Sequence, residues 1–560
     1  MDDSTGLQSM RSKSKAEVVE QQSLLYRPDT PSHIEQNVEN TVPKNTVVSW
    51  ISLPNKGQLM ILAMCRVSEP LSNSTLLAYI FYLLQTTLST PSSTPSNAEI
   101  ARVSGLLVAM FPFGQFLTSF LWGWLSDVYG RKPVIVFGLV VSVIANMGFG
   151  FSLNFESLLF WRFIAGLANG NTGVMRSMTA EIVEEKKHRA RAFMLLPLVF
   201  STGRILGMAF GGVFADPVKS LPHIFGTTGA LNVSKTSGGV AWMIHYPYAF
   251  PMIVNSAFMT AALILANFKL SETAPGRRQQ MCDLAVSWPF VVRSAHRLLR
   301  KSGSTRYTAV ETDEKQLEAQ GENNMYGSAQ PKRCAIWNRK TIRVIIFSGL
   351  LPLHNGAFTH LFAVFLSTPI AASNPSDLFH SAGGLGLTSQ SIGIVLAILG
   401  ISGIILKFFT YPPVHAHFGT LRTIWISLLL FPVAYFATPF LALISEQSIW
   451  RWLCVVSLLL TQIMARGFII PCSIMLLTDS VYQKGALGRV HGAANMLGSL
   501  AKALAPLIGG WIFSRGIEMN CIGMAWWFWL TPIAFVSLAW SFLLSDVDKI
   551  GEEIRSSHDI

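Results

Sequence analysis

The ten residues GWLSDVYGRK, at positions 123–132, lie between two apolar runs that are each long enough to cross a bilayer. This placement predicts a tight, charged turn between two helices at a membrane surface. The two glycines would allow close helix approach and a sharp bend, and the aspartate would cap the helix that follows. The two cations would lie at the anionic inner leaflet. The signature-turn residues are therefore Gly123, Asp127, Gly130, Arg131 and Lys132.

The whole chain has the composition of an integral membrane protein. Of its 560 residues, 50% are hydrophobic and 13% are charged, whereas soluble domains carry roughly 25% charged residues. The net charge of +12 lies in the tails and in alternate loops, so it indicates membrane orientation and no nucleic-acid partner. The six cysteines have no CxxC spacing, which predicts neither a disulfide framework nor a zinc site.

Twelve apolar windows of about 20 residues predict an all-α protein with twelve transmembrane helices. They fall into two groups of six, separated by a polar stretch. We predict a disordered cytoplasmic tail over 1–57, a six-helix bundle over 58–270, a cytoplasmic linker over 271–340, a second bundle over 341–545 and a cytoplasmic tail over 546–560. The windows are 58–84, 103–125, 133–153, 157–180, 192–214, 248–270, 341–366, 388–410, 423–444, 452–477, 489–513 and 524–544.

The distribution of Lys and Arg between short loops predicts the orientation. Basic residues follow the second and fourth windows, whereas the segments 86–100 and 367–388 contain no Lys or Arg. The excess of cations on the cytoplasmic side therefore places both termini in the cytoplasm. Asn232 then begins a glycosylation sequon in an outer loop.

The two groups of six windows repeat one another. Glu181 ends the fourth window as Asp479 ends the tenth, and Gly211 in the fifth corresponds to Gly509 in the eleventh. Both pairs share one offset, since 479 − 181 and 509 − 211 are both 298. Gly419 ends a weaker copy of the turn that lacks the aspartate. Two pseudo-symmetric bundles predict a site between them and transport by alternating access.

These motifs resemble those of the major facilitator superfamily. The turn is similar to that family's signature loop, and RFIAGLANG at 162–170 is similar to its second motif. Other blocks, such as CRVSEP at 65–70, resemble a fungal branch related to zinc-induced-facilitator-like transporters and to drug:proton antiporters. The resemblance covers all twelve windows. It implies the major facilitator fold and a secondary transporter, not an enzyme, with no cofactor.

The resemblance also assigns residues to two further motifs. The first, in the fourth window, consists of Arg162, Gly166, Gly170 and Glu181. The second is a set of hinge glycines in the fifth and eleventh windows, which comprises Gly203, Gly207, Gly211, Gly212, Gly509 and Gly510.

Ionisable residues within the windows are the candidates for coupling and substrate binding. Arg66 and Glu69 lie three residues apart on one helical face, so Glu69 is either a proton carrier or half of a structural ion pair. Arg204 and Lys502 occupy matching places in the fifth and eleventh windows. Facing one cavity they would favour an anionic substrate or exclude cations. Otherwise they would extend their charged ends to the membrane surface or pair with backbone carbonyl groups.

Two further sets of residues have structural predictions. We expect Arg176 and Arg466 to form ion pairs with Glu181 or Asp479. His354 and His360, six residues apart, lie on different sides of a helix and predict no joint metal site.

We therefore predict a proton-coupled exporter of a small organic compound, such as a drug or secondary metabolite. The chain has no Gly-Lys dipeptide and hence no P-loop. The alternatives are uptake or vacuolar transport of an organic anion or metal chelate, and a membrane sensor that does not transport. The expected partners are the substrate, protons and the lipid bilayer. We expect a monomer in the plasma membrane, with the vacuolar membrane as the alternative.

Overall fold

The computed structural model describes residues 54–183, 186–232, 238–273, 338–370, 383–444, 448–481 and 487–544. All of them belong to one compact unit that begins at Pro54. Most of the predicted tails and linker lies outside the described residues.

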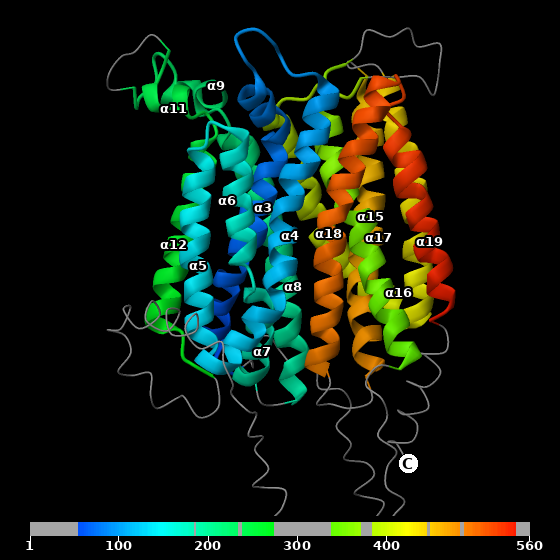
Figure 1. Cartoon of the computed structure of the whole chain (residues 1–560). Helices are drawn as coiled ribbons and strands as arrows, with labels where there is room; N and C mark the ends of the chain where they lie inside the picture. Colours follow the sequence, from blue (N-terminus) through cyan, green and yellow to red (C-terminus); the bar gives the residue numbers. More distant parts are fainter. Residues whose placement is uncertain are drawn as a thin grey trace, which may run out of the picture. The chain divides into compact units, whose positions relative to one another are not determined.

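The N-terminal half is helical throughout its described part (Figure 1). Three short helices, α9 (Pro217–Ser220), α10 (Pro222–Phe225) and α11 (Ala241–His245), lie between its last two long ones. The long helices are α3 (Lys56–Leu88), α4 (Asn97–Tyr129), α5 (Arg131–Gly150), α6 (Phe155–Leu167) with α7 (Asn171–Ile182), α8 (Lys186–Phe214) and α12 (Ala249–Lys269).

The C-terminal half repeats this arrangement. A positive φ of 72° at Gly419 divides α16 into two helical segments, so α16 corresponds to two predicted windows. The elements of this half are α15 (Arg339–Ser367), α16 (Ser389–Ala437), η3 (Thr438–Leu443), α17 (Ile449–Asp479), α18 (Leu487–Glu518) and η5 (Trp526–Leu530) leading into α19 (Thr531–Phe542).

All twelve predicted windows therefore correspond to helices in the described residues. Eight of the helices are long and apolar enough to cross a membrane on their own. The first helix, α3, is not among these eight, and it carries Arg66, Glu69 and several serines and threonines. Much of α3 is instead buried against other helices, as expected for a helix that faces the interior of a transporter.

The fourth window is not one helix, contrary to the prediction, because it breaks at residues 168–170 between α6 and α7. Side chains of α4 bind the carbonyl oxygens that the break exposes. Trp122 Nε1 and Thr118 Oγ1 donate to the Leu167 oxygen at 2.6 and 2.9 Å, and Gln115 Nε2 donates to the Asn169 oxygen at 3.2 Å. These bonds satisfy buried polar groups that the helix itself leaves unpaired.

Among the described residues, two contacts between one glycine and another join the halves. We call the end of the bundle that carries α9–α11 the short-helix end, and the opposite end, with Gly130 and Gly419, the turn end (Figure 1). A Cβ atom at Gly212 of α8 would lie 2.5 Å from the Cα of Gly393 in α16. A Cβ atom at Gly510 of α18 would lie 3.0 Å from the Cα of Gly105 in α4.

These two contacts are related by the internal repeat, since 510 − 212 is 298, the offset found in the sequence. Both lie near the short-helix end, because Gly212 is close to the last residue of α8 and Gly105 close to the first turns of α4. The pseudo-symmetry predicted from sequence is thus visible as a matched pair of seams, one of α4 with α18 and one of α8 with α16.

Candidate functional site

The signature turn has the predicted sharp bend. Gly130 has φ of +103°, a conformation that only glycine adopts without strain. Arg131 of the same turn binds two side chains of its own half. Its Nη1 donates to Ser126 Oγ at 2.7 Å, and its Nη2 lies 3.3 Å from Glu181 Oε1 at the end of α7. The turn therefore ties α4, α5 and α7 together at the turn end.

The cap of the helix after the turn comes from a residue that the sequence analysis missed. Glu272, which follows α12, accepts hydrogen bonds from the backbone N–H groups of Arg131 and Lys132 at 2.9 and 3.0 Å. A carboxylate at a helix N-terminus is stabilised by those free N–H groups and by the helix dipole. The sequence predicts this capping role for Asp127, whose side chain lies outside the part that the structure describes, and it places residue 272 in the linker. The sequence feature that indicates this cap is an acidic residue two positions after the end of the sixth window.

The contact predicted at Gly123 is wrong, because a Cβ atom there would meet no atom within 4 Å. The second-motif glycines do lie in tight packing. A Cβ atom at Gly166 would meet the backbone of Phe111 in α4, and one at Gly170 would meet the ring of Trp122. The Arg162 side chain is 7% exposed, and its Nη1 donates to Asn73 Oδ1 of α3 at 2.8 Å. These three residues therefore hold α6 and α7 against their neighbours.

The hinge glycines contact helices either of their own half or of the other half. Gly203, Gly207 and Gly211 pack against α3, where a Cβ atom would meet Val67 or Pro70, Leu71 and Thr75, respectively. Gly212 and Gly510 form the seams between the halves, and Gly509 faces Leu361 of α15.

Glu69 and Arg66 form the ion pair that their spacing predicts. Thr172 Oγ1 of α7 also donates to Glu69 Oε2 at 3.2 Å, and the Arg66 guanidinium lies 4.8 Å from the ring centroid of Phe200 in α8. The two charged side chains are only 11% and 12% exposed. Three helices of the N-terminal half thus position this pair.

A small polar cavity of about 20 Å³ lies beside Glu69 in the N-terminal half. Such a volume can hold about one water molecule. Its polar lining includes Ser68, Ser72, Asn146 and Asn169, and Ser72 donates to Asn146 Oδ1 at 2.6 Å.

Lys502 of α18, in the C-terminal half, interacts with the Arg66–Glu69 pair of the N-terminal half. It interacts electrostatically with Glu69 and Arg66 of α3, with Arg176 of α7 and with Arg466 of α17. Its side chain is nevertheless exposed although it lies midway along α18. Lys502 therefore faces a space between the halves that is open to solvent. Since the seams close the short-helix end, we infer that this space opens toward the turn end.

The same set of interactions extends to both halves. Arg204 of α8 interacts with Arg466, and so does Lys407 of α16. Within the described residues, the Lys, Arg, Asp and Glu side chains joined in this way are six cations and one carboxylate. We call them the central charge cluster: Arg66, Glu69, Arg176, Arg204, Lys407, Arg466 and Lys502.

The structure corrects the predicted partners of two of these arginines. Glu181 binds Arg131 and the hydroxyl of Thr273, while Arg176 interacts with Arg66 and Glu69. Arg466 and Asp479 are separated by about 20 Å along α17, at 1.5 Å per residue, which is too far for an ion pair. Both arginines thus belong to the central charge cluster.

The two histidines of α15 lie on different sides of the helix, as predicted. His354 Nδ1 lies 2.8 Å from the Tyr435 hydroxyl of α16, whereas His360 Nε2 lies 2.9 Å from Ser104 Oγ of α4. In the part of the chain that the structure describes, no three His, Cys, Asp or Glu side chains gather as metal ligands.

The sequon residue Asn232 is buried, with 7% of the residue exposed. Its Nδ2, the atom to which a glycan would be joined, donates to the Thr227 oxygen at 3.0 Å. Glycosylation at this site stays a prediction, and it would require this bond to break.

Comparison with known proteins identifies the family. A profile of the Major Facilitator Superfamily matches residues 65–280. The chain is 30% identical over 510 residues to the "Major facilitator superfamily multidrug transporter mfsB" of Aspergillus fumigatus, covering 85% of this chain and 81% of that protein. The chain belongs to the major facilitator superfamily.

Other relatives and solved structures agree with this family. "Protein ZINC INDUCED FACILITATOR 1" of Arabidopsis thaliana is 25% identical over 80% of this chain and 82% of its own length. A D-xylose–proton symporter has the same fold, with a TM-score of 0.56 and 12% identity over 88% of this chain and 97% of that one. The human organic anion transporter MFSD10 superposes with a TM-score of 0.54 and 17% identity over 88% and 99% of the two chains. This major facilitator protein is a multi-pass membrane transporter and not an enzyme.

Proposed function

We propose that this transporter moves a small organic anion by alternating access and that Glu69 is its proton site. The central charge cluster supports the anionic substrate. Its described groups are six cations and one carboxylate, and a charge within a membrane costs at least ~2.5 kcal/mol on insertion scales. An anion held between Lys502 and Arg466 of one half and Arg204 of the other would offset that cost.

The surroundings of Glu69 support its role as the proton site. Arg66 and Thr172 bind the carboxylate, and the small polar cavity adjoins it. Protonation of Glu69 would remove the negative charge that now lies beside Arg66 and Lys502. Those cations would then be free to bind the substrate.

The direction of transport has two candidates. The first candidate is export in exchange for protons; the name of one relative, the "Efflux pump azaK" of Aspergillus niger at 22% identity, supports the outward direction. The Glu69 geometry favours a second candidate, in which a proton and the anion move together. The carboxylate and the substrate compete for the same cations, so each proton bound would raise the affinity for the anion, and the reverse also holds.

Proteoliposomes with opposite pH gradients separate the two candidates. A panel of organic anions, including dicarboxylates, is offered to the purified chain, and uptake into the vesicles is measured. Uptake driven by a proton gradient directed into the vesicles indicates cotransport. Uptake driven by a proton gradient directed out of the vesicles indicates exchange. In either case Glu69→Gln should abolish accumulation driven by the pH gradient while exchange of anion for anion continues.

Lys502→Ala should weaken anion binding by at least about tenfold, the usual effect of losing a hydrogen bond to a charged group, and Lys502→Arg should restore most of it. Lys219→Gln is the matched control, because Lys219 is 84% exposed on α9. Transport of cations but not anions, or normal accumulation by Glu69→Gln, would contradict the proposal. Cysteines introduced into the turn at Arg131 and into α9 test the expected cytoplasmic position of both termini. A thiol reagent that does not cross the membrane, added outside intact cells, should label the cysteine in α9 and not the one in the turn.

A further inference from the structure

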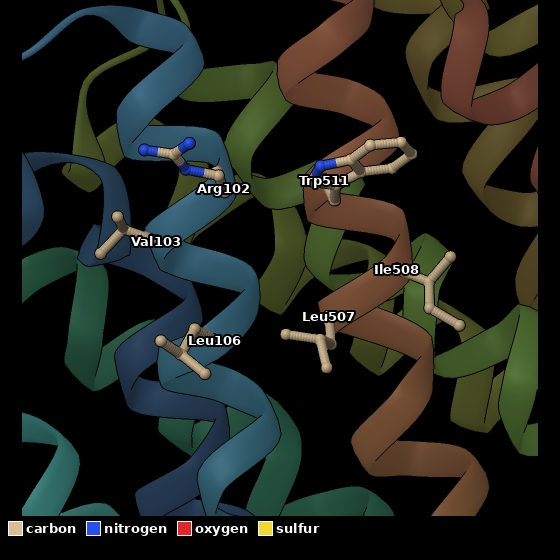
Figure 2. Close-up of a pocket in the computed structure, with 6 residues that line it drawn as sticks. All are labelled: Arg102, Val103, Leu106, Leu507, Ile508 and Trp511. Carbon is tan, nitrogen blue, oxygen red and sulfur yellow. The ribbon is translucent and has the colours of Figure 1, made fainter.

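An apolar groove of about 390 Å³ lies across the seam of α4 and α18 (Figure 2). Its walls are Val103 and Leu106 from α4 and Leu507 and Ile508 from α18. Leu507 is 40% exposed, so the groove opens on the outside of the bundle, where a membrane protein meets lipid. The volume lies within the range of about 300–1,000 Å³ that is usual for small-molecule pockets.

Two groups with polar ends occupy one end of the groove. Figure 2 shows Arg102 and Trp511 together at the end opposite Leu106 and Leu507. This is the end nearer the membrane surface, because Arg102 lies within the first turns of α4 and Trp511 within the last turns of α18. Tryptophan is enriched at this depth of a membrane protein.

The charge at this end comes mainly from Arg102. The Arg515 guanidinium lies 5.9 Å from the Trp511 ring centroid, but its Nη1 is bound to Glu518 Oε2 at 2.9 Å. The Arg102 side chain is exposed, and it has no hydrogen bond or ion pair with any of the described residues. The groove therefore combines apolar walls with a guanidinium that has no partner among the described residues. These features suit an amphipathic anion.

We propose that this groove binds one glycerophospholipid, with its phosphate on Arg102 and an acyl chain along the apolar walls. The phosphate lies at the level of the guanidinium, and charged hydrogen bonds of this kind are strong. A transmembrane helix of a partner would instead cover Arg102 with apolar side chains and leave its charge unpaired, which is strongly unfavourable. The proposal does not depend on the substrate of the transporter.

The lipid would also be selective for one conformation. The groove has one wall from each half, and the Gly105–Gly510 contact holds these walls together. When the seam opens at the short-helix end, the walls must separate and the groove is lost. A ligand that binds only the closed seam shifts the equilibrium toward it.

Native mass spectrometry of the purified, delipidated chain tests the site directly. The probes are a dioleoyl phospholipid and dioleoylglycerol, which has the same tails and no phosphate. We expect one phospholipid per chain to bind more tightly than any further copies, and dioleoylglycerol not to replace it. Arg102→Gln should weaken this first binding about tenfold, as expected for a charged hydrogen bond, and Leu106→Trp should abolish it by filling the groove. Ile401→Trp, at a 53% exposed position on α16, is the control and should bind like the unchanged chain.

Equal binding by all variants, equal binding of dioleoylglycerol, or a first lipid no tighter than the others would overturn the proposal, since each describes non-specific surface lipid. Formation of a dimer that displaces the lipid would also overturn the proposal, because a second copy of the chain would then occupy the groove.

Ser104→Cys provides a second measurement, made with Cys282, Cys334, Cys454 and Cys521 replaced by serine, so that the remaining native cysteines, Cys65 and Cys472, are buried. Ser104 is fully buried beside the seam, so maleimide reaches a cysteine there only when the seam opens. Arg102→Gln in lipid vesicles should raise the labelling rate about fivefold, at the low end of coupling between sites. An unchanged rate would contradict the conformational selectivity.

Discussion

In the N-terminal half α8 meets α3 through three glycines, whereas in the C-terminal half α18 meets α15 mainly through alanines. The positions equivalent to Gly203 and Gly207, at the offset of 298, are Ala501 and Ala505. In this interface the glycine that faces Ala505 belongs to α15, the partner helix. A Cβ atom at Gly356 would lie 3.6 Å from Ala505 Cβ, an ordinary packing distance. The first interface thus packs backbone against backbone, and the second retains room for a methyl group at Gly356.

This difference suggests which half is the more rigid. Close packing of small residues is a principal source of helix association in membranes. The Arg66–Glu69 pair lies on α3, the helix held by the glycine contacts, while the exposed Lys502 lies on α18. We infer that the N-terminal half holds the proton site in fixed geometry and that α18 has more freedom to move.

The same substitution in the two interfaces should have opposite results, and this is the largest effect that we expect. Gly207→Ala would drive a methyl group into the Leu71 carbonyl, and overpacking of this kind costs about 1–3 kcal/mol. Gly356→Ala has room, and it gains up to ~1 kcal/mol of helix propensity. Thermal unfolding of the two purified variants measures the contrast. Equal melting temperatures would show that the interfaces are equivalent.

The two turns offer a second contrast, of intermediate size. Glu272 caps α5 at the first turn, so Glu272→Ala should cost about 1 kcal/mol, the typical value of a helix cap. At the second turn His415 Nε2 lies 3.3 Å from Thr420 Oγ1, a longer contact between side chains, and His415→Ala should cost less. The measurement is unfolding by denaturant, and a greater loss for His415→Ala would reverse the comparison.

The broken fourth crossing and the continuous α17 give the smallest contrast. Thr118→Val removes one of two side-chain donors to the Leu167 oxygen, while Trp122 still donates to it. We expect a loss of about 0.5–1.5 kcal/mol, the net value of a hydrogen bond. Thr461→Val in α17, whose hydroxyl binds only its own helix, is the control. The prediction fails if the two variants unfold alike.

Apolar windows, turns and the repeat were enough to predict the helical architecture, because these patterns are local in sequence. The Arg66–Glu69 pair was predictable for the same reason, since a spacing of three residues determines which side chains share a face. Glu272 and the partners of Arg176 were not predictable. Their contacts join residues 140 or more positions apart or different helices, and such contacts depend on helix rotation and packing. The break before α7 was also missed because its stabilising donors come from α4.

Transport by alternating access requires the seam between α4 and α18 to open and close. Leu106→Cys and Leu507→Cys place thiols on opposite walls of the groove in Figure 2, where a short cleavable bis-maleimide can join them in vesicles. Both replacements are made in a chain in which Cys282, Cys334, Cys454 and Cys521 are serine. Transport of the anion is then measured before cross-linking, after it and after cleavage of the linker, with each of the two cysteine replacements made alone as a control. We expect transport to stop in the cross-linked double variant alone and to return on cleavage. Transport at the full rate across a cross-linked seam would contradict this expectation.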